Sequence, residues 1–262
     1  MNRAVPLLAA LLALGCHPGL KIDRTYTAKS QDSRAQFLIL HFTNEGFEDS
    51  VKILTQGKVS SHYLVREEPP AIYQLVDEGR RAYHAGVSTW KGQTMLNAAS
   101  IGIEIVNDGD RKGPNGLEFK AYSPAQIDRV VALVRDIVTR HQIRPDRVLG
   151  HSDIAPMRKV DPGPLFPWKR LADEGLVAWP DAAAVAKQLP RFQATLPEVG
   201  WFQKKLAEHG FDLPASGELD ARTRTTLAAF QMKYRPARWD GQPDAETAAL
   251  LEVLTAPEAP KP

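Results

Sequence analysis

The chain has 262 residues, which is enough for one or two domains with a sizeable hydrophobic core. Its composition, 43% hydrophobic and 24% charged, is ordinary for a soluble protein. The formal net charge of +2 and the lack of a Lys/Arg stripe argue against nucleic-acid binding.

The first sixteen residues, 1–16, differ from the rest of the chain. Asn2 and Arg3 form a short polar, basic start, and residues 4–14 are almost wholly apolar. This run is too short to span a bilayer as a helix and is typical of a signal-peptide core. Cys16 is the only cysteine, so the chain cannot form an intramolecular disulfide.

The place of Cys16 resembles a bacterial lipoprotein processing site, where the cysteine is lipidated and becomes the new N-terminus. Ala13 and Leu14 stand where such sites usually carry a leucine and a small residue. His17 follows the cysteine, and among lipoproteins a residue other than Asp there implies outer-membrane sorting, facing the periplasm. Lipidation would anchor the protein to a membrane without a transmembrane helix. The alternative is a plain secretory leader with an incidental cysteine.

Residues 17–35 are polar and predict an extended tether. Residues 36–43, QFLILHFT, form a continuous run of mostly large apolar side chains, which is typical of a strand buried on both faces. His41 lies at its C-terminal end, where strands of open α/β sheets meet ligand crevices. A lone histidine at a strand end is usually structural, so its role depends on other candidates.

The next predicted elements are a helix at 45–56 and strands at 59–65 and 71–76. The second of these elements carries His62, and a Gly-containing loop farther along carries His84. Each of these two histidines could contact substrate or serve as a hydrogen-bonding core residue, and the sequence does not decide between the two roles.

Residues 100–106 alternate, so that the isoleucines face one side of a strand and Gly102 and Glu104 face the other. A carboxylate inside a short apolar strand is unfavourable unless it has a partner, and a cationic metal site would supply one. The alternative is a strand-edge glutamate in solvent.

The sequence then predicts an exposed loop at 107–120 and a helix at 123–141 that begins with a capping-box pattern. Strands that alternate with helices indicate an α/β fold with a mixed central sheet flanked by helices.

The segment 149–168 contains four prolines and predicts a rigid, irregular loop that follows a short strand. It holds His151, Lys159 and Asp161. A catalytic zinc takes three protein ligands and keeps one position open for water. Together with His41, this loop therefore indicates a metal hydrolase, although the ligands are far apart in sequence and no HExxH motif is present.

Residues 179–197 are punctuated by prolines and predict a linker. Beyond them, residues 198–256 predict a small helical domain. A weak internal repeat, GELDART and GQPDAET, places Asp220 and Asp244 as helix N-caps after a glycine turn. Such a module is near the lower size limit for a self-sustaining core.

The region from about Phe37 to Trp168 resembles the amidase-2 family of zinc N-acetylmuramoyl-L-alanine amidases, which also includes phage T7-type lysozymes and peptidoglycan recognition proteins. The matching segments are LILHFT, VSSHYLV, YHAGVSTW, SIGIEI and GHSDIAPMRKVDPGPLFPW. AFQMKYRP and DGQPDAET resemble the peptidoglycan-binding module of lipoprotein amidases. The resemblance implies a catalytic domain at 36–178 and a small all-α, three-helix domain at 198–256.

By position, the resemblance implies that Zn²⁺ is bound by His41, His151 and Asp161. It implies further that Glu104 is the catalytic acid/base and that Lys159 stabilises the transition state.

Phe42 lies where the family contacts substrate, although a tyrosine is usual there, and His84 is a second candidate for a substrate contact. Ser61 stands where the T7-like branch carries a catalytic tyrosine, so the acid/base role falls to Glu104.

The implied reaction is hydrolysis of the amide bond between the lactyl group of N-acetylmuramic acid and L-alanine, in peptidoglycan or its fragments, for cell-wall turnover. The implied partners are peptidoglycan or muropeptides and a membrane, and the protein is expected to be a monomer. Two alternatives stay open: a receptor that binds peptidoglycan without cutting it, and a zinc peptidase that cuts within the stem peptide. The C-terminal module could bind the wall or only buttress the catalytic domain.

Overall fold

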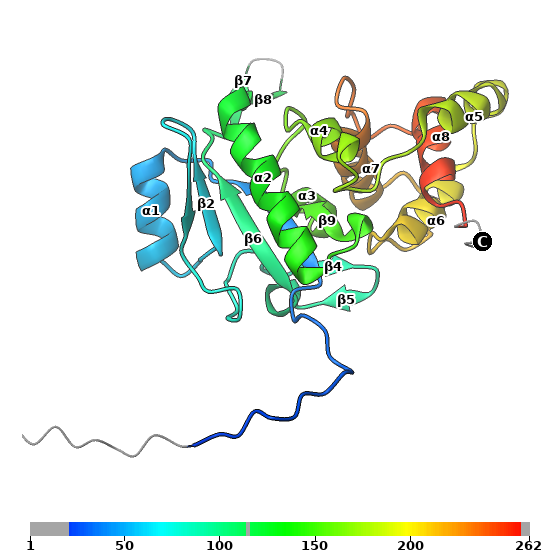
Figure 1. Ribbon diagram of the computed structural model, residues 1–262. Helices are drawn as coiled ribbons and strands as arrows, with labels where there is room; N and C mark the ends of the chain where they lie inside the picture. The colour runs from blue at the N-terminus through cyan, green and yellow to red at the C-terminus, as the bar shows by residue number, and fades with distance from the viewer. Residues whose placement is uncertain (1–20, 114–115, 258–262) are drawn as a thin grey trace, which may run out of the picture. The chain divides into compact units, whose positions relative to one another are not determined.

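The structure is a computed structural model that describes residues 21–113 and 116–257 (Figure 1). The chain divides into two compact units, Met1–Asp32 and Ser33–Pro262. The described part of the first unit is exposed and contains no helix or strand. The predicted leader and Cys16 lie outside the described residues. Within the described ranges, no helix combines the length and the apolar character needed to cross a membrane.

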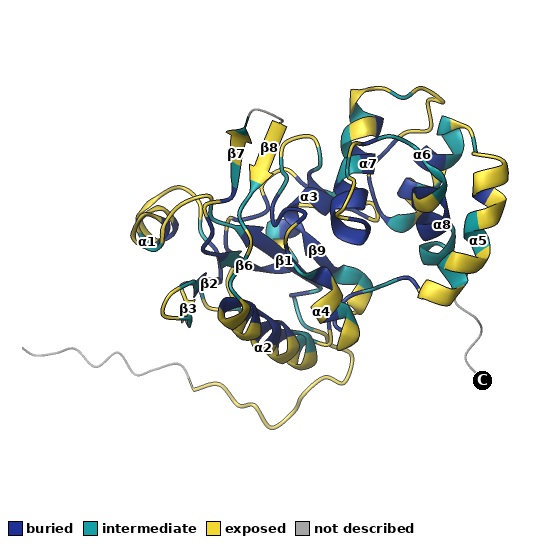
Figure 2. Ribbon diagram, turned by 90° about the horizontal axis from the view of Figure 1, so that it is seen from above, coloured by how far each residue is buried: buried dark blue, intermediate teal, exposed yellow. Residues whose placement is uncertain are grey.

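A five-stranded sheet forms the centre of the second unit, with the strand order β3-β2-β6-β1-β9. The strands are β1 (Phe37–Phe42), β2 (Tyr63–Arg66), β3 (Ala71–Gln74), β6 (Ser100–Ile105) and β9 (Val148–Gly150). Four strands run parallel, and β3 pairs antiparallel with β2. The predicted mixed sheet is therefore confirmed. Figure 2 shows its middle strands as buried, whereas α1 and α2 expose their outer sides.

The two faces of the sheet have different neighbours. Leu38, Leu40 and the isoleucines of β6 belong to one hydrophobic cluster with the long helix α2 (Pro124–His141), which crosses that face in Figure 1. The alternate residues of β1, among them Ile39 and His41, face the other side. Because β1 and β6 are neighbours in parallel register, His41 lies beside Glu104 on this second face.

The start of α2 follows the prediction in part. Ser123 caps the helix by accepting a hydrogen bond from the Gln126 backbone N–H at 3.3 Å. The Gln126 side chain does not close a capping box. It donates instead to the carbonyls of Val65, at 3.2 Å, and Val106, at 2.8 Å, and so ties α2 to β2 and to the residue that follows β6.

Two predictions in this region are wrong in detail. The predicted loop at 107–120 contains a hairpin of β7 (Asp110–Gly113) and β8 (Gly116–Phe119). Its strands are short, charged and largely exposed, so they lack the apolar alternation that marks a strand in a sequence. The predicted loop at 149–168 also begins with a helical turn, α3 (His151–Ile154), rather than with irregular chain.

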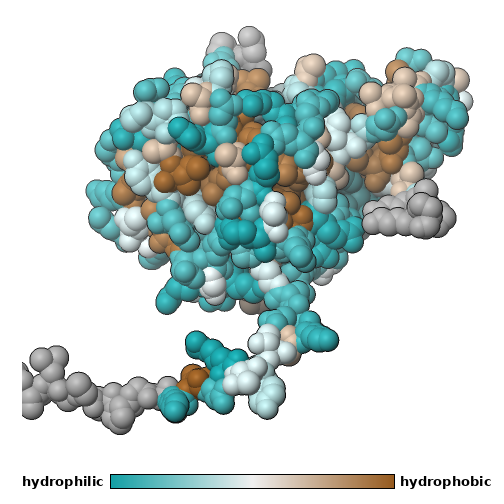
Figure 3. Space-filling view, viewed as in Figure 1, coloured by the Kyte–Doolittle hydropathy of each residue, from teal (hydrophilic) through white to brown (hydrophobic). Residues whose placement is uncertain are grey.

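The remaining elements of this part are α1 (Phe47–Gln56), β4 (Thr89–Trp90), β5 (Gln93–Thr94), the 3₁₀ helices η1 (Leu96–Ala98) and η2 (Pro145–Arg147), and α4 (Trp168–Asp173). Hydrophilic side chains cover most of the face shown in Figure 3.

The predicted linker at 179–197 contains a helix, α5 (Ala182–Ala194), which packs against the last helix of the chain. Asp181 caps it by accepting from the Ala184 N–H at 2.7 Å. Prolines disfavour helix interiors, which is why the sequence predicts a linker here. However, Pro180 precedes the cap, and Pro190 is accommodated inside the helix.

The three predicted C-terminal helices are present as α6 (Val199–His209), α7 (Ala221–Tyr234) and α8 (Ala245–Leu254). Asp220 and Asp244 cap α7 and α8 as predicted, each accepting a backbone N–H three residues on.

The internal repeat has a structural basis in two buried glutamines. The Gln203 amide donates to Thr223 Oγ1 at 2.8 Å and accepts the Gly217 N–H at 2.8 Å, and so fixes the turn before α7. Gln231 makes the equivalent bonds to Thr247 and to the turn before α8. Each helix thus holds the start of the next.

The helical region shares its core with the sheet. One hydrophobic cluster contains Phe37, Ile39 and Leu149 from the strands together with Phe202 and Phe230 from α6 and α7. The two parts of the second unit are therefore packed together rather than joined only by chain.

Candidate functional site

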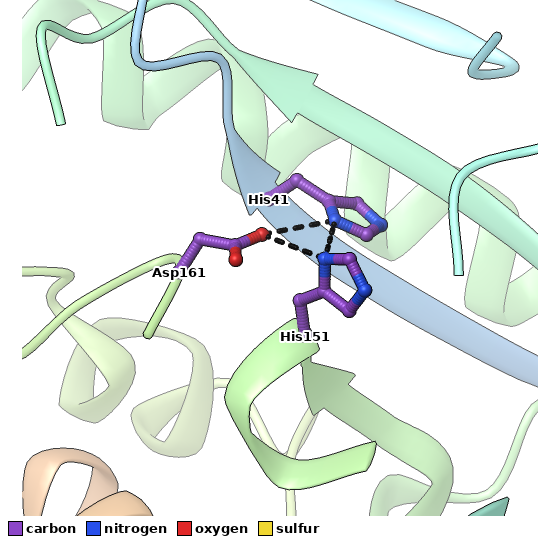
Figure 4. Close-up of side chains that lie close together, drawn as sticks. All are labelled: His41, His151 and Asp161. Carbon is purple, nitrogen blue, oxygen red and sulfur yellow. Dashed lines mark hydrogen bonds and ion pairs between the residues drawn. The ribbon is translucent and has the colours of Figure 1, made fainter. Parts of the chain in front are cut away.

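Three of the predicted site residues meet at one edge of the sheet (Figure 4). His41 is near the end of β1, His151 is the first residue of α3 directly after β9, and Asp161 lies on the following loop. His41 Nδ1 lies 2.9 Å from His151 Nδ1 and 3.0 Å from Asp161 Oδ2, and His151 Nδ1 lies 3.1 Å from the same oxygen. All three residues are buried. They meet because β1 and β9 are parallel neighbours whose C-terminal ends share an edge.

A chain of hydrogen bonds behind His41 fixes which of its nitrogens carries the proton. The Leu96 carbonyl can only accept, so the Ser100 hydroxyl donates to it and accepts from His84 Nε2–H at 3.1 Å. His84 Nδ1 is then the acceptor for His41 Nε2–H at 3.0 Å. His41 Nδ1 is consequently left without a proton and presents a lone pair.

His151 is fixed in the same way by a backbone group. Its Nε2–H donates to the Ala85 carbonyl at 3.1 Å, which leaves Nδ1 as a bare acceptor. Two unprotonated nitrogens and a carboxylate oxygen thus face one another at hydrogen-bond distance with no proton to share.

This arrangement is suited to a cation. Three acceptors would repel one another unless a positive ion lies among them, and the three donor atoms all lie within 4.8 Å of one another. Two imidazoles and one carboxylate are ligands that zinc accepts, and catalytic zinc sites commonly use three protein ligands. The residues His41, His151 and Asp161 could therefore hold a metal ion.

The electrostatics keep His41 and Asp161 in the forms that bind a metal. Burial and the proximity of the His151 ring lower the pKa of His41 to about 4, although Asp161 opposes the shift, so His41 is neutral at neutral pH. Burial acts to raise the pKa of Asp161, but the two histidines outweigh it and hold that pKa well below its usual range. A neutral imidazole and an ionised carboxylate are the forms that bind metals.

His84 occupies a space that a missing side chain creates. A Cβ at Gly102 would lie 2.5 Å from the His84 ring, so only glycine at that position of β6 admits it. Burial and the neighbouring histidines lower the pKa of His84 well below its ordinary value, and the ring is therefore neutral. His84 also lines the pocket described below, and its predicted substrate contact remains a prediction.

His62 is placed as a core hydrogen-bonding residue. Its Nδ1 accepts the Gly102 backbone N–H at 3.0 Å, and its Nε2 lies 3.1 Å from the Arg80 carbonyl. It is fully buried and is not among the residues that line the pocket.

Replacing His84 by alanine should weaken metal binding, because His41 would lose the partner that orients its ring and fixes its tautomer. Outer partners of this kind typically contribute about 10–100-fold to metal affinity. Competition for zinc with a chromophoric chelator measures the change, and thermal unfolding of the metal-free variant shows whether it is folded. An affinity equal to that of the unmodified protein would contradict the assignment.

A pocket of about 190 Å³ opens over the three converging residues, and Glu104, Lys159 and Phe42 line it as well. Within the described part of the chain, neither Glu104 nor Lys159 forms an ion pair or hydrogen bond with another side chain. Both groups are therefore available to a bound molecule. Burial, together with the charge of Asp161, raises the pKa of Glu104 well above its ordinary value, although Lys159 opposes the shift. A carboxyl group with a raised pKa can both accept and return a proton near neutral pH.

Phe42 lines the pocket next to the first ligand, where the sequence places a substrate contact, and that role remains a prediction. Ser61 is fully buried and is not among the residues that line the pocket.

Arg158 is a site residue that the sequence analysis missed. Its guanidinium donates to the carbonyls of Ala85 and Val87, so it holds the loop that fixes His151. A Cβ at Gly86, which has a φ of +59°, would lie 2.9 Å from this guanidinium. An arginine beside a lysine in a proline-rich loop gives no sequence signal that would distinguish it from a surface charge.

Comparison with known protein families gives two matches. Residues 31–164 match the family described as N-acetylmuramoyl-L-alanine amidase, and residues 195–251 match a family described as a putative peptidoglycan binding domain. The first covers the sheet, the three converging residues, Glu104 and Lys159, and the second covers α6, α7 and most of α8.

Individual relatives agree with these matches. The chain is 41% identical to the N-acetylmuramoyl-L-alanine amidase AmiD of Escherichia coli over 261 residues, which covers 94% of each chain. It is 38% identical to the 1,6-anhydro-N-acetylmuramyl-L-alanine amidase AmpD of Enterobacter cloacae over 112 residues, or 43% of this chain and 54% of that one.

Two solved structures share the fold over most of the chain. One is AmiD from Escherichia coli with the substrate anhydro-N-acetylmuramic acid-L-Ala-D-γ-Glu-L-Lys, with a TM-score of 0.82, 40% identity, and coverage of 90% of this chain and 94% of that one. The other is AmpDh3 from Pseudomonas aeruginosa with anhydromuramic pentapeptide, with a TM-score of 0.84, 39% identity, and coverage of 89% and 97%.

Proposed function

Because this chain belongs to the N-acetylmuramoyl-L-alanine amidase family, we propose that His41, His151 and Asp161 hold a zinc ion at its catalytic centre. The protein is an amidase that hydrolyses the bond between the lactyl group of N-acetylmuramic acid and L-alanine in peptidoglycan fragments. One observation above all supports the assignment of residues: three converging metal-type acceptors share a pocket with Glu104 and Lys159.

The proposed zinc ion and the residues of the pocket have separate roles in the reaction. A bound zinc ion supplies Lewis acidity, which polarises a carbonyl group and lowers the pKa of water to about 7. His84 and the Ala85 carbonyl keep the two histidine ligands in the tautomer that leaves Nδ1 free.

Glu104 moves the proton. It takes a proton from the water molecule that attacks the lactyl carbonyl carbon, and the raised pKa of its carboxyl group favours this transfer near neutral pH. It then gives the proton to the amide nitrogen as the C–N bond breaks. The products are a lactyl carboxylic acid on the sugar and a peptide that begins with the free amine of L-alanine.

Lys159 stabilises charge on the substrate. Its ammonium group lines the same pocket as Glu104, and the carbonyl oxygen becomes negative when water adds to the carbon. A fixed cation close to that oxygen lowers the free energy of the transition state more than that of the substrate.

Lys159→Ala should keep the metal and lose most of the turnover. Loss of one group that stabilises an oxyanion typically lowers kcat by about 10²–10³-fold. Steady-state hydrolysis of an anhydromuropeptide measures the loss, and Lys169→Ala, on the exposed surface of α4, is the control. Turnover of Lys159→Ala at the rate of the control would refute the role.

Digestion of anhydro-N-acetylmuramic acid-L-Ala-D-γ-Glu-L-Lys, followed by mass spectrometry, tests the function as a whole. We expect release of the intact tripeptide and the sugar acid, and no release after chelation. A peptidase of the stem would instead leave L-alanine on the sugar. A receptor without activity would leave the compound intact, and either result would overturn the proposed function.

We propose that the catalytic domain spans residues 36–178 and that the C-terminal helices at 198–256 bind the cell wall. The match of residues 195–251 to a peptidoglycan binding domain supports this role, while the shared core also fits the alternative of a structural buttress. Binding of a Glu104→Gln variant to purified sacculi, measured by co-sedimentation, separates the two roles. The variant does not digest the sacculi, and excess anhydromuropeptide occupies its catalytic pocket. Retention would support a second binding surface, and complete release would favour the buttress.

We propose that the enzyme is a monomer that acts in the cell envelope and carries a lipid anchor at Cys16 on the outer membrane, facing the periplasm. A peptidoglycan substrate and the leader sequence support this location. Fractionation of cells that produce the protein and its Cys16→Ala variant tests the anchor. Equal recovery of both in the soluble periplasmic fraction would contradict it.

A further inference from the structure

We propose that a groove beside the catalytic pocket binds the stem peptide of the substrate and that Arg224 pairs with one of its carboxylates. The inference rests on the proposed function. The groove, called here the α7 groove, has a volume of about 340 Å³ and is lined by Pro156, Lys159, Val160, Arg224, Met232 and Trp239, among others. Its distinctive feature is that the helical region supplies one wall of it.

The α7 groove adjoins the catalytic pocket. Lys159 lines both of them. Aromatic rings approach one another near this point: a Cβ at Gly163 would lie 2.8 Å from the Phe119 ring and 3.6 Å from the Phe42 ring, which lines the pocket. Phe119 then packs edge-on against Trp239, with ring centroids 5.6 Å apart. A ligand that extends from the pocket past Lys159 therefore reaches the α7 groove, which Trp239 lines.

The α7 groove carries free positive charge. Arg224 is exposed, and among the described residues it has no ion pair, whereas Arg222 on the same helix is paired with Asp212 at 2.8 Å. Asp240 also lines the groove, but Arg238 offsets its charge at 2.8 Å. The groove thus offers an unpaired guanidinium between the apolar surfaces of α7 and Trp239.

The chemistry of the substrate matches this charge. The peptide L-Ala-D-γ-Glu-L-Lys, present in the ligand of the AmiD structure, has two carboxylates: the α-carboxylate that the γ-linkage leaves free, and the C-terminal carboxylate. Both lie beyond the amide bond that is cut. A planar guanidinium can bind a carboxylate through two parallel hydrogen bonds, and the aliphatic parts of the peptide can pack on the apolar walls.

Hydrolysis of three matched substrates by the full-length protein tests the inference. The substrates are anhydro-N-acetylmuramic acid-L-Ala-D-γ-Glu-L-Lys, the form whose glutamate α-carboxylate is amidated, and the form whose C-terminal carboxylate is amidated. We expect the unmodified protein to prefer the free tripeptide over one amidated form by about 10-fold in kcat/KM, mainly through KM, as for a charged hydrogen bond. The amidated form with the lower kcat/KM shows which of the two carboxylates Arg224 binds.

The Arg224→Gln variant is expected to hydrolyse all three substrates with similar kcat/KM. The Arg222→Gln variant is expected to keep the preference of the unmodified protein. The Arg224 side chain is exposed, and the close contact of Gly241 is with its backbone carbonyl, so the substitution leaves the fold intact. If Arg224→Gln keeps the rates and preference of the unmodified protein, the proposed peptide site is wrong. If the unmodified protein cuts none of the substrates, the proposed function itself fails.

Discussion

Glu104→Gln is expected to lower kcat by about 10²–10⁴-fold while the protein keeps its metal. Glutamine has nearly the shape of glutamate but cannot accept a proton from water, so the variant removes the proton transfer and little else. Glu104 is not one of the three converging ligands, so zinc content should not change. Steady-state kinetics on an anhydromuropeptide, with metal analysis of the same samples, measure both quantities.

The pH dependence gives this prediction a second readout. Catalysis needs ionised Glu104, so activity falls as pH falls through the pKa of this group. Burial and Asp161 raise that pKa, and the acidic limb should therefore lie above the ordinary value of 4.5. The limb should be absent from the residual activity of Glu104→Gln.

Glu118→Gln, on the exposed hairpin, is the matched control. If Glu104→Gln turned over substrate like this control, Glu104 would not be the base. If Glu104→Gln lost its metal, Glu104 would be a ligand instead.

Lys233→Met is expected to lower the free energy of unfolding by about 3–5 kcal/mol, because it leaves a buried charge without its partner. Lys233 Nζ lies 2.8 Å from Asp153 Oδ2, and the two side chains are only 4% and 3% exposed. The ammonium group also donates to the Val148 carbonyl at 3.2 Å and lies 4.3 Å from the centre of the Trp168 ring. Urea unfolding of the metal-free protein measures the loss.

The ion pair joins the helical region to the metal site. Asp153 accepts the Gly150 N–H at 2.8 Å and belongs to α3, whose first residue is His151. Lys233 therefore holds the short helix that carries His151, and the variant is also expected to bind zinc more weakly. Lys204→Met, on the exposed side of α6, is the control. A variant at Lys233 as stable as this control would show that the pair does not hold the two parts together.

The sequence singles out His41 and Glu104 because strand ends and strand alternation are local features. The run that ends in His41 and the alternation that isolates Glu104 need only short-range patterns. Their pairing across β1 and β6 depends on strand order, which a single sequence does not reveal. The resemblance to a family supplied the link between these residues that periodicity could not.

Other parts of the site depend on tertiary contacts between distant positions. The role of His84 follows from the space above Gly102 and from the tautomer of His41, neither of which is visible in the sequence. Lys233 and Asp153 are 80 residues apart, and each is typical of a surface charge until the fold buries them together. Likewise, α5 contains Pro190, and a local rule for prolines predicts a linker where packing against α8 stabilises a helix.

Metal analysis of the purified protein, after incubation with zinc and removal of the excess, shows whether His41, His151 and Asp161 hold an ion. We expect one zinc ion per chain, and much less in an Asp161→Ala variant that is still folded, because one of three converging acceptors is lost. A protein that retains no metal, or an Asp161→Ala variant that binds zinc as tightly as the unmodified chain, would show that these residues do not form a metal site.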